Sequence, residues 1–475
     1  MTIKFGTDGW RAVISDTFTF ENLRLVSQAT ADYLLENAPA APSVVIGFDT
    51  RFLSDRYATE VAKVMAGNGI TAHLTRADCP TPAISYNVVH KKANLGVMIT
   101  ASHNPPRYNG YKLKADYGGA VTKDVTENIA ARLQTNKAAG KQPKLMPYED
   151  ALAAKRILRF DPAWAYYEHL TSNLIDLDII SAGELRVVAD GMYGSGRGAF
   201  REVLSRTRTR VFNIRSEMNP GFGGIHPEPI ARFLEELVAT VKNRHAHIGL
   251  ATDGDADRIG AVDALGNFID PHHIMALSLR YLYEKRGWRG AVVKTVSSTL
   301  MLNRLAKKYN LPLHETPVGF DGIAHLMMTD DVLIGGEESG GISIKGHVPE
   351  GDGVLMGLLL LELLADANVP LHELVADLQK TVGPTYYRRT DIKLSRPVPK
   401  KEMVERLANE APATINGERI VSVQTNDGIK FMMADDSWLL IRPSGTEPVL
   451  RVYSEAADKA AVQNILAAGH TMAKI

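Results

Sequence analysis

A plan that recurs three times in the sequence constrains the fold more than any other feature. A short apolar run, with the length of a buried strand, leads into a small polar loop at residues 94–105, 247–258 and 331–341. Segments of helical periodicity separate the strands, and this alternation is typical of βαβ units with a mainly parallel sheet. Because ligands collect at the carboxyl ends of such strands, we expect the three polar loops to converge.

The length of the chain indicates several domains. Its 475 residues are enough for three or four domains of roughly 100–150 residues each. A polar stretch with Gly and Pro at 136–148 favours a first boundary there, and predicted antiparallel strands replace the βαβ pattern in the C-terminal part. We therefore predict an α/β protein in which three related domains with mixed, mainly parallel sheets and a C-terminal α+β domain surround a central cleft. The predicted ranges are 1–148, 149–258, 259–373 and 374–475.

Composition excludes some partners. Lys and Arg total 54, as do Asp and Glu, so the formal net charge of zero gives no reason to expect nucleic acid or an anionic membrane. Cys79 is the single cysteine and cannot form an internal disulfide, which suits a reducing compartment. The first residues lack the apolar region of a signal peptide, and the apolar run 354–361 is too short to span a bilayer and predicts a buried helix. We expect a cytoplasmic protein.

The first polar loop contains a candidate nucleophile, Ser102. It follows the apolar run 95–99, and the turn formers Asn104 and Pro105 end the strand just beyond it. A serine hydroxyl is a weak nucleophile unless a base or a metal activates it or it carries a transferable phosphate. Taken alone, these residues are better explained as a turn without chemistry, but the other polar loops reverse this interpretation.

The second polar loop is typical of a metal site. Asp253, Asp255 and Asp257 alternate after an apolar run, and three carboxylates this close repel one another unless a cation neutralises them. Oxygen ligands without Cys or His nearby suit Mg²⁺. An EF-hand is excluded because its bidentate Glu is missing at the required distance. A solvated acidic turn is the alternative, and the flanking Arg258 favours the metal site.

A loop near the C-terminus is typical of a phosphate-binding site. Arg442 follows an apolar strand pattern and offers a fork for phosphate oxygens. Ser444, Thr446 and the backbone at Gly445 add donors that form an anion nest, and Arg451 follows closely. The chain has no Walker A sequence, so the usual signature of nucleoside triphosphate chemistry is missing.

The third polar loop offers hydrogen-bond acceptors. Glu337, Glu338 and Ser339 have no positive neighbour within the loop and precede two glycines, which favours sugar hydroxyls as ligands over a merely solvated surface. The glycine cluster at 191–198 resembles a dinucleotide loop only loosely, and glycine-rich turns of this kind are common, so we predict no nucleotide site there.

Together these motifs resemble those of the α-D-phosphohexomutase superfamily, of the phosphoglucomutase/phosphomannomutase type. The resemblance covers the full chain, and the matching motifs occur in family order at 6–11, 100–105, 253–258, 336–341 and 442–448.

The resemblance implies a role for each matching residue. Ser102 would be the phosphoserine that donates and recovers a phosphoryl group, and its phosphate would hold Mg²⁺ together with Asp253, Asp255 and Asp257. Glu337 and Ser339 would bind sugar hydroxyls. The non-transferred phosphate would bind to Arg442, Ser444, Gly445 and Thr446. Further positions implied in the site are Arg11, His103 and Lys112 near the phosphoserine, where the family places its acid/base candidates, and Arg258, Gly319, Arg451 and His347, the last resembling the histidine of the phosphoglucomutase branch.

The activity implied is reversible phosphoryl transfer between glucose 1-phosphate and glucose 6-phosphate, with mannose phosphates as further substrates. Glucose 1,6-bisphosphate would be intermediate and activator, and a monomer or homodimer is expected. Three alternatives stay open: a sugar bisphosphate synthase, a phosphoglucosamine mutase and a sugar-phosphate-binding protein without turnover. Gly341 stands where related dual-specificity enzymes often carry His, and Asp321 where they often carry Lys or Arg, so the sugar preference also stays open.

Overall fold

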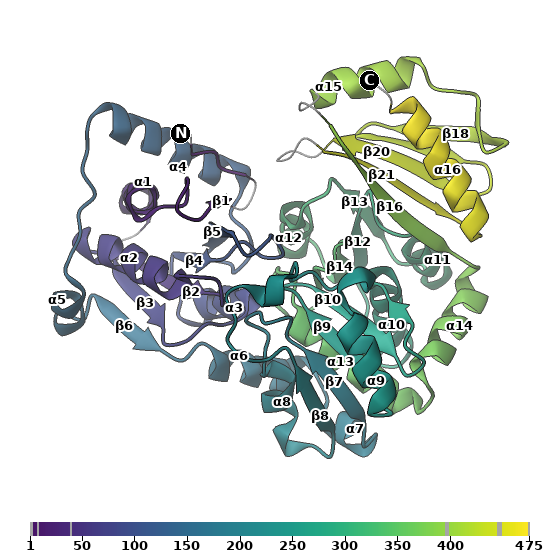
Figure 1. Cartoon of the computed structure of the whole chain (residues 1–475), viewed down its shortest axis with the longest axis horizontal. Coiled ribbons are helices and arrows are strands. Elements are labelled where there is room, and N and C mark those ends of the chain that lie inside the picture. Colours follow the sequence, from purple (N-terminus) through teal and green to yellow (C-terminus); the bar gives the residue numbers. More distant parts are fainter. Residues whose placement is uncertain (1–2, 7–8, 39, 395–398, 444–448, 474–475) are drawn as a thin grey trace.

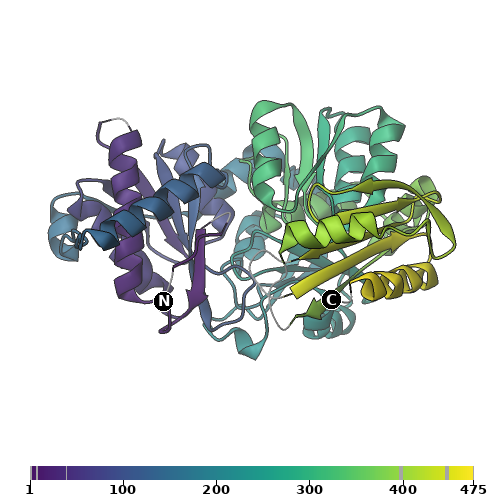
Figure 2. The ribbon, with the colours of Figure 1, turned by 90° about the horizontal axis from the view of Figure 1, so that it is seen from above.

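The computed structural model describes residues 3–6, 9–38, 40–394, 399–443 and 449–473. In this part of the chain four β-sheets follow one another, and their units form an arc with the first and the fourth at its two ends (Figure 1). Seen from above, the N-terminal unit stands to one side of the remaining chain (Figure 2).

The first unit has the sheet order β1-β5-β4-β2-β3-β6, in which β2 pairs in parallel with β3 and β4 and β5 is antiparallel to β4. The N-cap Thr19 starts its first helix, because the threonine hydroxyl accepts a hydrogen bond from the amide of Asn22. Its elements are β1 (Gly9–Val13), α1 (Phe20–Asn37), β2 (Ser43–Phe48), α2 (Ser54–Gly67), β3 (Thr71–Thr75), α3 (Thr81–His90), β4 (Leu95–Ile99), β5 (Tyr108–Ala115), α4 (Lys123–Ala138), α5 (Tyr148–Ala153) and β6 (Ile157–Phe160).

The second unit has the sheet order β11-β10-β9-β7-β8, with parallel pairing among β8, β7 and β9. Its helices are α6 (Ala163–His169), the π-helix η1 (Leu170–Leu174), α7 (Leu177–Ala182), α8 (Ala199–Val203), α9 (Glu235–Asn243) and the 3₁₀ turns η2 (Leu204–Arg206), η3 (Phe222–Gly224) and η4 (Ala231–Phe233). Its strands are β7 (Arg186–Asp190), β8 (Arg210–Ile214), β9 (Ile248–Thr252), β10 (Ile259–Asp263) and β11 (Phe268–Ile269).

The third unit has the order β13-β12-β14-β15, and the fourth is an antiparallel sheet with the order β16-β21-β20-β19-β18-β17. The third contains α10 (Pro271–Glu284), β12 (Ala291–Thr295), α11 (Leu300–Tyr309), β13 (Leu313–Thr316), α12 (Phe320–Thr329), β14 (Val332–Gly336), β15 (Ile342–Ile344), α13 (Gly353–Ala367) and α14 (Leu371–Val382). The fourth contains β16 (Tyr386–Lys393), α15 (Lys400–Asn409), β17 (Thr414–Ile415), β18 (Glu418–Gln424), β19 (Ile429–Met433), β20 (Trp438–Pro443), β21 (Val449–Ala456) and α16 (Lys459–Met472).

One strand order repeats in the first three sheets, as the recurring sequence plan predicts. It reads β3-β2-β4-β5 in the first, β8-β7-β9-β10 in the second and β13-β12-β14-β15 in the third. In each, the third strand pairs in parallel on one side and with an antiparallel return strand on the other. The three polar loops are the turns into those return strands, so the repeat gives them equivalent places.

The sheets divide the chain later than the predicted boundaries. β6 pairs with β3 of the first sheet although it lies beyond residue 148, and β10 pairs with β9 of the second although it lies beyond residue 258. The first two sheets therefore extend past the predicted boundaries at residues 148 and 258, because an edge strand is assigned by a hydrogen-bonded partner that is distant in sequence. α14, which crosses the third predicted boundary at residue 373, contacts α10 and α11 of the third unit.

The pair Asn109-Gly110 is a dipeptide typical of tight turns, but here it forms part of a strand. Both residues lie inside β5, which continues to Ala115. A Cβ at Gly110 would come within 2.4 Å of the carbonyl oxygen of Thr100 and 2.9 Å of that of Trp10. The glycine is there to let neighbouring backbones approach closely.

The buried apolar residues of the described chain form six clusters, one of which is a large core that several units share. The large core runs from the α3 side of the first sheet through the second and third units, whereas the fourth unit has its own core between its sheet and the helices α15 and α16. α13 is buried from Gly353 to Leu364, as its apolar run predicts. Among the described residues no single helix has both the length and the apolar character to cross a membrane; α13 and α14 meet these criteria together, but with a bend of 87° between them.

Candidate active site

Ser102 lies directly after β4 in a strained turn and faces the metal loop of the second unit. Its φ of 50° is in the left-handed region, and its amide donates to the hydroxyl of Thr100 at 2.9 Å. Its Oγ donates to Oδ2 of Asp253 at 2.9 Å and is 3.4 Å from Nδ1 of His103. The strand end therefore presents the hydroxyl to a carboxylate that lies 151 positions further along the chain.

Arg51 holds the Ser102 loop in place through hydrogen bonds to its backbone. The sequence analysis did not predict this residue in the site. Its guanidinium donates five hydrogen bonds at 2.5–3.1 Å, one to the carboxylate of Asp49 and four to backbone carbonyls of the loop and its exit. The four carbonyls belong to Ser102, Asn104, Pro105 and Tyr108. All five N–H groups of a buried arginine thus serve to fix the shape of this loop.

Asp49 extends the same network to the strand end. It accepts hydrogen bonds from the hydroxyls of Thr100, at 2.7 Å, and Ser54, at 2.9 Å. Asp49 and Arg51 follow β2, whose carboxyl end lies beside that of β4, and this position is the signal that could have revealed them.

The aspartate loop lies between β9 and β10. Oxygen atoms of Asp253, Asp255 and Asp257 all lie within 4.8 Å of one another, and all three residues are buried. Burial raises the pKa of Asp253 well above its usual range, and the neighbouring Asp257 and Asp255 add to this effect. Oδ1 of Asp255 and Oδ1 of Asp257 are buried without a hydrogen-bond partner in the described part of the chain. Such crowded, unsatisfied oxygens fit a hard divalent cation.

Two side chains of the first unit join this loop. Nζ of Lys112, on β5, is 2.7 Å from Oδ2 of Asp257, and the hydroxyl of Thr81 donates to Asp255 at 2.6 Å. Gly254 permits the close approach, because a Cβ there would be 2.5 Å from the carbonyl oxygen of Ser102. The serine and aspartate loops therefore form one site across two units.

Positive charge surrounds His103. Burial lowers the pKa of its imidazole well below the usual range, and Arg258, Arg11, Arg451 and Arg51 lower it further. Arg11, on β1, donates to the side chain of Asn104 at 2.9 Å. The four arginines come from the first, second and fourth units, and all of them act on the pKa of the imidazole next to Ser102.

The third polar loop lies beside this cluster. Oε1 of Glu337 accepts a hydrogen bond from the amide of Gly319 at 2.9 Å, and burial raises the pKa of Glu337 to about 7 against the influence of Arg258. The hydroxyl of Ser339 is buried without a partner in the described residues, so it can take a ligand hydroxyl. Glu338 differs, because Arg389 of β16 lies 3.3 Å away and supplies the positive neighbour that the loop itself lacks.

The predicted phosphate loop is described in part. Arg442 of β20 lies directly opposite Arg451 of β21, and two like charges in this position favour a bound anion. Nε of Arg442 donates to Asp427 at 2.7 Å. The predicted residues Ser444, Gly445 and Thr446 lie outside the described residues.

His347, which the resemblance implies in the site, lies between α6 and α13. Its side chain is fully buried, stacks on His169 of α6 at 5.3 Å and lies 3.0 Å from Asp352 at the start of α13. Asp352 also accepts hydrogen bonds from the hydroxyl of Tyr166. These contacts are with α6 and α13, so His347 packs the second unit against the third.

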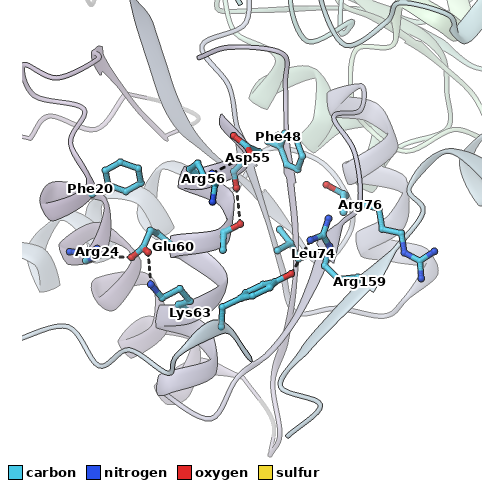
Figure 3. Close-up of a pocket in the computed structure, with 13 residues that line it drawn as sticks. Phe20, Arg24, Phe48, Asp55, Arg56, Glu60, Lys63, Leu74, Arg76 and Arg159 are labelled. Carbon is cyan, nitrogen blue, oxygen red and sulfur yellow. Dashed lines mark hydrogen bonds and ion pairs between the residues drawn. The ribbon is translucent and has the colours of Figure 1, made fainter. Parts of the chain in front are cut away.

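A separate hollow of about 630 Å³ opens between α2 and β6 in the first unit (Figure 3). Its charged side chains largely pair with one another: Arg24 and Lys63 with Glu60, and Arg56 with Asp55. Arg76 points away from the other side chains in the close-up (Figure 3). The hollow shares no lining residue with the site around Ser102.

The fold and the site define a four-domain sugar-phosphate mutase class, and comparison with known proteins agrees. The phosphoglucomutase/phosphomannomutase family profiles match over residues 2–140 for α/β/α domain I, 164–266 for domain II, 270–382 for domain III and 392–468 for the C-terminal domain. The chain belongs to the α-D-phosphohexomutase superfamily.

Its relatives differ in their named substrates. A phosphoglucomutase of Komagataeibacter xylinus is 30% identical over 97% of this chain and 88% of its own. A phosphoglucosamine mutase of Carboxydothermus hydrogenoformans is also 30% identical, over 97% of both chains. Among solved structures, a candidate phosphomannomutase from Thermus thermophilus has 33% identity and a TM-score of 0.86, with 99% of both chains covered.

Proposed function

We propose that this phosphohexomutase interconverts glucose 1-phosphate and glucose 6-phosphate, with mannose phosphates as further substrates. The observation that carries the proposal is the hydrogen bond from Oγ of Ser102 to Asp253, which joins a buried hydroxyl to three carboxylates. In the active form Ser102 carries a phosphate, and the three aspartates with that phosphate hold Mg²⁺. The cation supplies charge neutralisation for the transferring phosphoryl group.

The chain's own residues handle the two half reactions. In the first, the bond from phosphorus to Oγ of Ser102 breaks and Oγ takes up a proton. A new bond forms from phosphorus to the oxygen of the free sugar hydroxyl, and that hydroxyl loses its proton to a group near Ser102. Lys112 and His103 are the candidates for this proton. The product is glucose 1,6-bisphosphate, which turns around so that its other phosphate passes to Oγ of Ser102. In this second transfer the serine hydroxyl gives up its proton and the sugar oxygen regains one.

The remaining side chains position the sugar. Glu337 and Ser339 hold hydroxyl groups, and Arg442 and Arg451 hold the phosphate that is not transferred. Arg258 and Arg11 stabilise negative charge on the transferring group without reorganising, because they are fixed by the fold.

Rates with three sugar phosphates test the proposal. We expect turnover of glucose 1-phosphate and mannose 1-phosphate, stimulation by glucose 1,6-bisphosphate, loss of activity with EDTA and a phosphate on Ser102 by peptide mass spectrometry. An active preparation in which Ser102 stays unmodified throughout turnover would contradict the mechanism.

A phosphoglucosamine mutase is the second candidate, because a relative of that name is as similar as the phosphoglucomutase. Phosphoglucosamine mutases typically have Gln and His where Glu338 and Gly341 stand, which favours the first proposal. A preference for glucosamine 1-phosphate in the rate measurements would favour the phosphoglucosamine mutase. Net accumulation of the sugar bisphosphate would instead favour a bisphosphate synthase.

A further inference from the structure

One buried carboxylate joins the third and fourth units beside the proposed phosphate site. Asp427 lies in the turn between β18 and β19 and is 3% exposed. Its Oδ2 accepts hydrogen bonds from the amide of Val318, at 2.9 Å, and from Nε of Arg442, at 2.7 Å. Lys400, at the start of α15, contacts the other oxygen, Oδ1. One carboxylate oxygen therefore holds the side chain of Arg442 against a turn of the third unit.

The neighbouring glycine fits the same arrangement. Gly428 has a φ of 87°, and a Cβ there would lie 2.5 Å from the carbonyl oxygen of Ile441 and 3.0 Å from Cβ of Arg442. Any larger residue would push the turn away from β20 and move Asp427 with it. The side chain of Asp427 and the backbone at Gly428 thus both pack closely against Arg442.

The turn that Asp427 holds also carries the contact to Glu337. The amide of Gly319, next to Val318, donates to Oε1 of Glu337 at 2.9 Å. Two successive amides of one turn are therefore held from opposite sides, by Glu337 of the third unit and by Asp427 of the fourth. The hydrogen bonds run in a continuous line from Glu337 to Arg442.

The negative charge of Asp427 also affects the orientation of Arg442. Arg442 lies directly opposite Arg451, so the two guanidinium groups repel each other when no anion is bound. Burial alone would raise the pKa of Asp427, but Lys400, Arg442 and the amide of Val318 outweigh it and lower the pKa, so the group carries its negative charge. That charge offsets the repulsion and keeps Arg442 in one orientation.

We propose that Asp427 is a positioning residue that aims Arg442 at the sugar phosphate group that is not being transferred, and that it couples this contact to Glu337. The inference rests on the proposed function, because it takes Arg442 as the ligand of that phosphate. The bisphosphate must be bound in two orientations in turn, and an arginine already held in place loses less conformational freedom at each binding.

A double-mutant cycle with glucose 1-phosphate tests this. Asp427→Ala should raise KM about tenfold in the parent, as expected for a lost hydrogen bond to a charged group, and by less than about twofold in the Arg442→Ala background. Lys400→Met is the graded comparison: it removes the contact to Oδ1 and leaves the contact of Oδ2 with Arg442, so KM should rise by less than in Asp427→Ala. Hydrogen exchange in the peptide around Val318 should lose protection in Asp427→Ala and keep it in Lys400→Met.

The outcomes separate this inference from the proposed function. An equal rise of KM in both backgrounds, or a parental KM in Asp427→Ala, overturns the positioning role. A parental KM in Arg442→Ala alone contradicts the proposed role of Arg442 and removes both. Should Asp427→Ala fail to fold, Asp427→Asn retains the volume and one acceptor oxygen, and its KM should lie between the parental value and that of Arg442→Ala; a parental value there also overturns the inference.

Discussion

At the scale of single residues, Arg51 decides how well Ser102 is presented. Its hydrogen bonds go to Asp49 and to four backbone carbonyl groups of the Ser102 loop and its exit. Arg51 therefore acts on the Ser102 hydroxyl through the shape of the loop. Arg51→Lys keeps the positive charge beside Asp49 but cannot reproduce the planar fork of five donors. We expect kcat to fall about 10- to 100-fold, since a loosened loop misplaces the reacting oxygen, with a smaller change in KM.

Single-turnover phosphorylation of Ser102 by glucose 1,6-bisphosphate, together with hydrogen exchange in residues 100–108, measures this effect. Arg56→Lys is the control, because Arg56 lies on the same segment but its side chain is 74% exposed in a loose pair with Asp55. Parental exchange and parental phosphorylation in Arg51→Lys would show that the loop holds its shape without the clamp.

At the scale of elements, the start of α10 links stability to pH. Asp270 caps the helix by accepting from the amide of His273 at 3.0 Å, and its carboxylate lies 2.7 Å from Nδ1 of that imidazole. Burial opposes the charge on each, but their mutual attraction raises the pKa of His273 and lowers that of Asp270. A raised histidine pKa gives stability that is complete below the unfolded value of about 6.5 and is lost as pH rises through the folded value.

The difference in the free energy of unfolding between the parent and His273→Gln should therefore depend on pH. His273→Gln should be less stable than the parent by on the order of 1 kcal/mol at pH 6, and the gap should narrow towards pH 9. Chemical unfolding of both proteins across this range measures it, and other titrating groups cancel in the difference. A gap that widens with rising pH would mean that the imidazole is neutral in the folded protein.

At the scale of the whole molecule, the fourth unit has an apolar core of its own. Its core is separate from the large core shared by the second and third units, and a smaller apolar cluster around Trp438 and Val296 joins it to the third. Ser102 and Arg442 lie in the first and fourth units, at the two ends of the arc (Figure 1), so we expect a substrate that binds both residues to bring these ends together.

Small-angle scattering with and without glucose 1-phosphate should therefore show compaction in the parent and less in Arg442→Ala, whose KM should rise because the phosphate loses a paired contact. Parental compaction and parental KM in the variant would place Arg442 outside the binding site. Compaction in neither protein would show that the arc is rigid.

The sequence by itself determined the features that depend on neighbouring residues. Apolar runs next to turn formers located β4, β9 and β14, and the crowding of Asp253, Asp255 and Asp257 indicated a cation before any distance was known. The repeat predicted that their loops are equivalent, because the same strand–loop plan produces the same local geometry.

Only the tertiary structure decided which distant segments meet. Gly110 indicates a turn in sequence but serves close contact between strands, and His347 matches a motif yet packs against α6. Arg51 and Asp427 carry no local signature of their function, since their partners are backbone groups that lie far away along the chain. Such hydrogen bonds and packing contacts form only when segments that are distant in sequence come together in the fold. The composition and periodicity of a single segment do not show which other segment it will meet.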